Sequence, residues 1–172
     1  MKSTKTSYLV FVGLMIAFVC MGTMTVHIYM PATNGFINIG DSIIFITSIL
    51  FGPVPGMIAG GIGSALADIL LGYTHWAVFT LIIKGIEGFI VGALMKKYSN
   101  KFTMIISTII GALFMVFGYY IAGGILEGSF IVALESIPGN IIQGIASVII
   151  GVFVAMAILK TNYIKRKSPS RY

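Results

Sequence analysis

The 172-residue sequence has little charge and one cysteine. Only 9% of its residues are Asp, Glu, Lys or Arg, whereas 58% are hydrophobic. Soluble domains carry about 25% charged residues, so this composition excludes an ordinary soluble domain. The apolar runs are long enough for membrane helices rather than barrel strands, which predicts an all-α integral membrane protein. Cys20 stands alone, and this excludes a disulfide framework.

Motifs of several enzyme classes are also missing. There is no Gly-x-x-x-x-Gly-Lys-Ser/Thr loop, so the chain cannot by itself couple transport to ATP through such a loop. His-Glu-x-x-His, metal-spaced cysteine pairs and a Gly-x-Ser-x-Gly elbow are absent as well. His27 and His75 are isolated, and we expect them to be loop residues rather than metal ligands. The sequence therefore predicts no enzyme activity, no metal and no cofactor.

Six apolar runs are present, and they form one transmembrane domain over residues 1–172. We expect helices at 7–26, 39–51, 55–71, 77–95, 102–125 and 138–159, followed by a basic cytoplasmic tail at 160–172. The second run is short for a span at ~1.5 Å per residue, so a partly buried loop is expected to assist it. The segment 27–38 contains Pro31 and Gly35 and cannot be a continuous helix. We expect it to lie at the membrane surface or to fold back over it.

The basic residues predict the topology. Ten of the eleven Lys and Arg residues fall in three places, namely the N-terminus, the loop after the fourth run and the tail: Lys2, Lys5; Lys96, Lys97, Lys101; Lys160, Lys165, Arg166, Lys167, Arg171. Such residues mark cytoplasmic loops. Four spans and then two separate these places, so six helices with both termini in the cytoplasm fit the pattern.

Four charged residues lie inside the apolar runs, where charge is costly unless it faces a protein interior or a wet cavity. They are Asp41, Asp68, Lys84 and Glu87. A helix-capping role for Asp41 and a structural ion pair of Lys84 with Glu87 or Asp68 remain open alternatives. In the predicted topology these residues reach a similar depth in the outer half of the membrane, together with Asn140 and Gln143 of the last span. Polar groups from four helices at one level can line a small-molecule pocket.

Four stretches of the sequence together carry a specific resemblance. They are GFINIGD at 35–41, GGIGSALAD at 60–68, KGIEG at 84–88 and PGNIIQ at 138–143. In this combination the chain resembles, over most of residues 7–158, the substrate-binding S components of energy-coupling factor (ECF) vitamin transporters. The resemblance implies a six-helix bundle in a prokaryotic plasma membrane that captures a vitamin or precursor from outside. It also implies docking on a transmembrane T component that is driven by two separate ATPase subunits.

The resemblance further implies roles for particular residues. The first loop would act as a lid, and Gly13 and Ala17 match the small-residue docking motif of the family's first helix. The branch points to hydroxymethylpyrimidine or a pyridoxine-like ring, and riboflavin-type members share the pattern. Aromatic walls and directed polar contacts would hold such a ring, with interfacial anchoring the expected role of Trp76. The candidate binding residues are Phe36, Asn38, Asp41, Asp68, Lys84, Glu87, Tyr119, Tyr120, Asn140 and Gln143.

Two other functions stay open from the sequence. One is a proton-coupled transporter that works alone and uses Asp68, Lys84 and Glu87 as a relay. The other is a structural or assembly subunit in which two rows of small residues serve packing only, one of Gly56, Gly60 and Ser64 and the other of Ala59, Gly63 and Ala67.

Overall fold

The computed structural model describes residues 5–30 and 35–161. These described residues form seven helices and two strands, in the order α1 (Lys5–Thr25), β1 (His27–Met30), β2 (Gly35–Asn38), α2 (Gly40–Phe51), α3 (Pro53–Leu70), α4 (Thr74–Lys97), α5 (Lys101–Leu126), α6 (Phe130–Ala133) and α7 (Ser136–Lys160).

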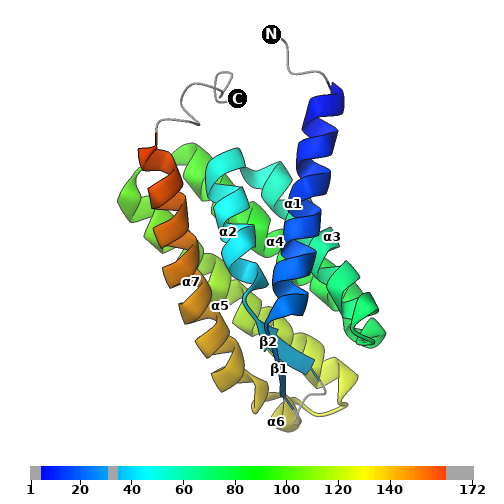
Figure 1. Ribbon diagram of the computed structural model, residues 1–172. Helices are drawn as coiled ribbons and strands as arrows, with labels where there is room; N and C mark the ends of the chain where they lie inside the picture. Colours follow the sequence, from blue (N-terminus) through cyan, green and yellow to red (C-terminus); the bar gives the residue numbers. More distant parts are fainter. Residues whose placement is uncertain (1–4, 31–34, 162–172) are drawn as a thin grey trace.

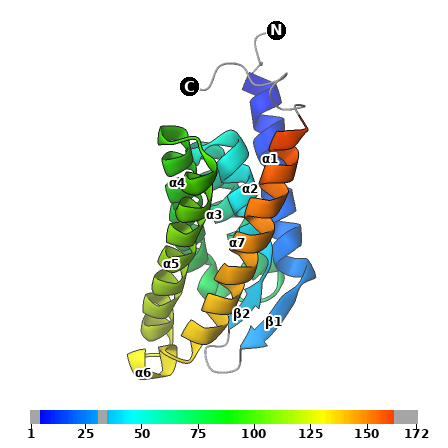
Figure 2. The same cartoon turned by 90° about the vertical axis from the view of Figure 1, so that its left-hand side faces the viewer.

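The long helices run roughly antiparallel and form one bundle (Figures 1 and 2). The start of α1, the end of α7 and the α4–α5 turn lie at one end of the bundle, and the β1–β2 hairpin and α6 lie at the other (Figure 1). The helices α1, α3, α4 and α5 and the segment Phe130–Lys160 are each long and apolar enough to cross a membrane. The prediction of a helical membrane bundle is thus confirmed in its general form.

The segment 27–38 differs from the sequence-based expectation, because its described part is a β-hairpin. β1 and β2 pair antiparallel, with His27 opposite Asn38 and Tyr29 opposite Phe36. The purely α-helical prediction is therefore wrong at this point. The sequence correctly excluded a continuous helix here, but it did not predict the two strands, each of which has only four residues. Residues 31–34, between the two strands, lie outside the described residues.

Helix α2 is short and lies inside the bundle. It has 12 residues, about 18 Å of helix, and it contacts α1, α3, α4 and α7. Since other helices surround it, α2 does not have to match the thickness of the lipid by itself. β2 leads directly into α2, whose first turn lies near the middle of the bundle (Figure 1). Asn38 ends β2, and Asp41 belongs to this first turn.

Glycines let α3 and α4 pack with their backbones in contact. A Cβ on Gly88 would lie 2.4 Å from the carbonyl oxygen of Gly56, and one on Gly60 would lie 2.7 Å from that of Lys84. On the neighbouring face of α3, a Cβ on Gly63 would lie 2.8 Å from the carbonyl oxygen of Ile16 in α1. The two rows of small residues in α3 therefore serve two different partner helices, as close packing in membranes requires.

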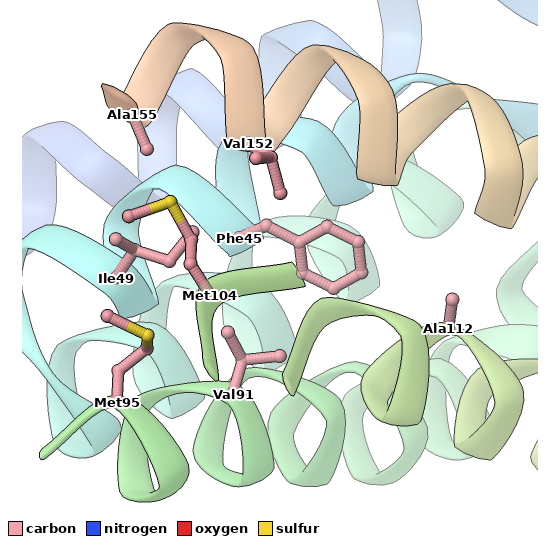
Figure 3. Close-up of a cluster of buried hydrophobic side chains, with 8 residues drawn as sticks. All are labelled: Phe45, Ile49, Val91, Met95, Met104, Ala112, Val152 and Ala155. Atoms are coloured by element: carbon pink, nitrogen blue, oxygen red, sulfur yellow. The ribbon is translucent and has the colours of Figure 1, made fainter. Parts of the chain in front are cut away.

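An apolar cluster fills the half of the bundle nearer the chain ends. It joins α2, α4, α5 and α7, and Phe45 of α2 lies at its centre with no exposed surface (Figure 3). The other buried members are Ile49, Val91, Met95, Met104, Ala112, Val152 and Ala155. Asp41, Asp68 and Lys84 lie beyond this cluster, toward the hairpin ends of their helices.

Candidate binding cavity

A buried network of ion pairs and hydrogen bonds joins α2, α4 and α7. The Lys84 Nζ donates hydrogen bonds to Asp41 Oδ1 and, over 3.0 Å, to Glu87 Oε2. These three side chains are at most 1% exposed. The sequence suggested Glu87 or Asp68 as the ion-pair partner of Lys84. Glu87 does pair with Lys84, and the second partner is Asp41 rather than Asp68. Asp41 is thus more than a helix-capping residue, since its carboxylate neutralises a buried ammonium.

Gln143 connects this network to the hairpin. Its Nε2 donates to Asp41 Oδ2 over 2.8 Å, and its Oε1 accepts from the backbone N–H of Asn38 over 2.8 Å. The side chain of Asn38 in turn accepts from the N–H of Gly40 over 2.8 Å. One amide therefore links the last helix, the first turn of α2 and β2, and it fixes the hairpin against the bundle.

A polar cavity lies next to this network. The hairpin and the helices α1, α3, α4, α5 and α7 contribute to its wall: Thr23, Phe36, Asn38, Ser64, Asp68, Trp76, Thr80, Lys84, Tyr119, Ser136 and Asn140. Its open volume is about 30 Å³, close to the space of a single water molecule. An aromatic ring can enter only if wall side chains and the hairpin shift.

The wall has a regular pattern along the helices. α4 contributes Trp76, Thr80 and Lys84, each four residues apart, and such residues lie on one helix face. Ser64 with Asp68 in α3, and Ser136 with Asn140 in α7, repeat the spacing. Sequence reasoning named Asp68, Lys84 and Asn140 as binding residues and missed Ser64, Thr80 and Ser136. A step of four residues from each buried charge or amide would have found them.

The predicted binding residues fall into three groups. Phe36, Asn38, Asp68, Lys84, Tyr119 and Asn140 line the cavity. Asp41, Glu87 and Gln143 lie behind that wall and hold Lys84 and Asn38 in place. Tyr120 packs against Phe130 of α6, with ring centroids 5.9 Å apart, and is not part of the wall. Trp76, which was expected to anchor at the interface, is only 6% exposed and belongs to the wall.

A second, more open cleft of about 640 Å³ lies at the hairpin end. Tyr29 of β1, Tyr73 and His75 near the start of α4, and Glu127 at the end of α5 contribute to it. Tyr73 packs against Phe36, with ring centroids 4.8 Å apart. Since Phe36 lines the inner cavity, this ring pair separates the inner cavity from the outer cleft. Within residues 5–30 and 35–161, no three His, Cys, Asp or Glu side chains are grouped so as to hold a metal ion.

One face of α1 has no partner in the described chain. Gly13 and Ala17 are both exposed, and a Cβ on Gly13 would meet no atom within 4 Å. Small residues permit close approach of a second helix. The predicted docking positions are thus accessible to another protein.

Comparison with known proteins shows the family. Residues 3–160 match the family described as ECF-type riboflavin transporter, S component. An uncharacterized protein of Pyrococcus woesei, described as lying in a gap 3' region, is 43% identical over 133 residues, which cover 77% of this chain and 88% of that protein. The thiamine precursor transporter HmpT of Lactococcus lactis is 29% identical over 133 residues, covering 77% and 75% of the two chains.

The fold agrees with this assignment. The crystal structure of the S-component for biotin from an ECF-type ABC transporter matches with a TM-score of 0.67 and covers 99% of this chain and 96% of that one. The sequence identity is 21%, so this likeness concerns the fold alone. The resemblance predicted from the four sequence stretches is confirmed. The chain belongs to the family of ECF-type riboflavin transporter S components, and it is a multi-pass membrane protein with the fold of a transporter component.

Proposed function

We propose that the protein is the substrate-binding subunit of an ECF-type importer and captures a vitamin or vitamin precursor with a small heteroaromatic ring. The observation that carries this proposal is the cavity, where buried polar side chains of the hairpin and several helices face one another. Hydroxymethylpyrimidine and pyridoxine-like rings are the preferred candidates, because the similarity to HmpT adds to the resemblance of the sequence. Native mass spectrometry of the purified protein tests the proposal by identifying a small molecule that is carried through purification.

The proposed orientation places the cavity toward the outside of the cell. Lys96, Lys97 and Lys101 lie at the α4–α5 turn, at the same end of the bundle as the start of α1 and the end of α7. Basic residues favour the cytoplasmic side, so the hairpin end would face outward. This proposal includes six spans, both termini in the cytoplasm and a location in the cell membrane. The short α2 and β2 would together form one of the six spans.

The hairpin is the proposed lid of the cavity. It contributes Phe36 and Asn38 to the wall, and Phe36 separates the wall from the outer cleft through its contact with Tyr73. A movement of β2 would break the hydrogen bond from the Asn38 N–H to Gln143 and open the cavity from outside. A cavity of about 30 Å³ requires some movement of this kind before a ring can bind.

Loss of the Asn140 amide should weaken binding. This side chain is 3% exposed and lies in the cavity wall, and one neutral hydrogen bond is worth about 0.5–1.5 kcal/mol, so Asn140→Ala should weaken binding by about 2–10-fold. Trp76 is the only tryptophan of the chain, so quenching of its fluorescence measures the binding of the retained ligand. Ile142→Ala, on an exposed face of the same helix, is the control. Equal affinities of the Asn140→Ala variant and the unchanged protein would count against this cavity as the binding site.

Docking on a transmembrane partner is the proposed use of the exposed face of α1. Leucines at Gly13 and Ala17 should reduce co-purification with the T component and its ATPases about tenfold, because side chains now fill the space for a closely packed helix. Ligand binding should stay unchanged, since neither residue lines the cavity. Leu113→Phe, on a lipid-facing position of α5, is the control. A doubly substituted protein that still forms the full complex would show that docking uses another surface.

Reconstituted transport separates this function from that of a proton-coupled transporter working alone. We expect the purified chain to bind its ligand in proteoliposomes without accumulating it, and to import it only with the T component, the ATPases and ATP. Uptake by this chain alone, driven by a pH gradient, would contradict the proposal.

A further inference from the structure

Three buried polar atoms in the cavity wall have no hydrogen-bond partner. They are Asp68 Oδ2, Trp76 Nε1 and Thr23 Oγ1, and the three residues are 4%, 6% and 2% exposed. A buried polar group without a partner costs about 1–3 kcal/mol. All three residues line the same cavity, so a molecule bound there can satisfy them together.

Asp68 differs from the other buried acids in its surroundings. Asp41 and Glu87 both accept a hydrogen bond from Lys84, whose Nζ has no hydrogen bond to Asp68. The described spans therefore bury three carboxyl groups and one ammonium, and Asp68 is the buried acid that has no ion-pair partner among the described residues. A ligand with an N–H donor would stabilise this carboxylate, and a charge-assisted bond of this kind is about twice as strong as a neutral one.

Trp76 requires a hydrogen-bond acceptor on the ligand, whereas Asp68 requires a donor. The indole N–H is a donor only, so its partner must be an acceptor. The ring of Trp76 packs against that of Tyr119, with centroids 5.8 Å apart, so both rings border the cavity as apolar surfaces. The Thr23 hydroxyl can both donate and accept a hydrogen bond, so it does not distinguish a ligand donor from a ligand acceptor.

From these atoms we propose that the cavity selects a flat nitrogen heteroaromatic ring with an amino substituent. The amino group would donate to Asp68 Oδ2, and a ring nitrogen would accept from the Trp76 N–H. This inference rests on the proposed function and narrows its ligand class. Pyridoxine and riboflavin carry no amino substituent, so they would have to reach Asp68 through a ring N–H or a hydroxyl group instead.

A pair of matched compounds tests the inference. Isothermal titration calorimetry compares hydroxymethylpyrimidine, which carries the amino group, with its analogue in which hydrogen replaces that group. The unchanged protein should prefer the amino compound by about 100-fold, because the analogue leaves a buried carboxylate without its bond. The preference is a ratio within one protein, so a general loss of affinity in a variant cancels.

Two substitutions of Asp68 assign the preference to this residue. In Asp68→Ala the ratio should fall to within about threefold, and in Asp68→Asn, which keeps a neutral acceptor of the same size, to about tenfold. Trp76→Phe keeps the aromatic surface and removes the N–H, so it should weaken the binding of the amino compound about tenfold. Glu135→Gln, an exposed acid at the start of α7, should keep the full ratio.

The outcomes separate this inference from the proposed function. Equal binding of the two compounds, a full ratio in Asp68→Ala, or binding of only pyridoxine or riboflavin would overturn the inference and leave the proposed function standing. If the unchanged protein binds none of these compounds and retains no small molecule in native mass spectrometry, both fall. Gel filtration confirms that each variant is folded before titration.

Discussion

Replacing Lys84 by methionine should destabilise the fold more than any other single change of charge. The substitution leaves Asp41 and Glu87 buried, close together and without their ammonium partner. Breaking a buried ion pair from one side costs about 3–5 kcal/mol, because an uncompensated charge stays in a medium of low polarity. We expect the midpoint of thermal unfolding in detergent to fall by about 10 °C. Circular dichroism of the purified variant measures this shift.

Two further variants separate charge from shape. Lys97→Met removes a lysine from the exposed end of the same helix and should leave the midpoint within about 2 °C, since exposed charges contribute little. The triple variant Lys84→Met, Asp41→Asn, Glu87→Gln keeps similar volumes and removes all three charges, so it should recover most of the lost stability. If Lys84→Met melts with the unchanged protein, or if the triple variant melts no higher than the single one, the ion pairs do not hold the helices together.

The same network accounts for what the sequence could predict. A charge within an apolar run signals a buried partner whatever the fold, because the cost of an isolated charge in lipid is so large. This rule alone drew attention to Asp41, Lys84 and Glu87, which the structure brings together from two helices. It did not say which acid pairs with Lys84. That choice depends on the place where α2 begins, and the hairpin sets this place.

The uncharged polar residues of the cavity wall were harder to predict from the sequence. Serine and threonine are common in membrane helices and often bond to their own backbone, as Ser48 and Thr108 do. Thr80 and Thr23 gave no such signal, although both lie in the cavity wall. The hairpin was missed for a related reason, because four-residue strands are too short to show a period. The sequence therefore revealed mainly those site residues whose burial without a partner would cost much free energy, namely the charged ones.

The position of the cavity depends on both kinds of information. α3 supplies Asp68 and α4 supplies Lys84, so the distance between these helices decides whether the two side chains share one wall. Glycines determine that distance, since a carbonyl of each helix lies where a side chain of the other would begin. A change at this contact should therefore affect stability and binding together.

Gly88→Ala tests this coupling. The added methyl group would lie 2.4 Å from the carbonyl oxygen and 2.6 Å from the carbonyl carbon of Gly56, so the helix backbones must move apart. Overpacking of this kind costs about 1–3 kcal/mol or more, and the separation should also weaken ligand binding at least tenfold, since Asp68 and Lys84 move apart.

Gly85→Ala is the matched control, because the same methyl group on the same helix would meet its nearest atom at 3.6 Å, an ordinary contact. Alanine favours a helix over glycine by about 1 kcal/mol, so this control should be neutral or stabilising. Thermal unfolding and titration of both variants decide the matter, and equal behaviour of the two would show that the contact between α3 and α4 tolerates a side chain and does not set the geometry of the cavity.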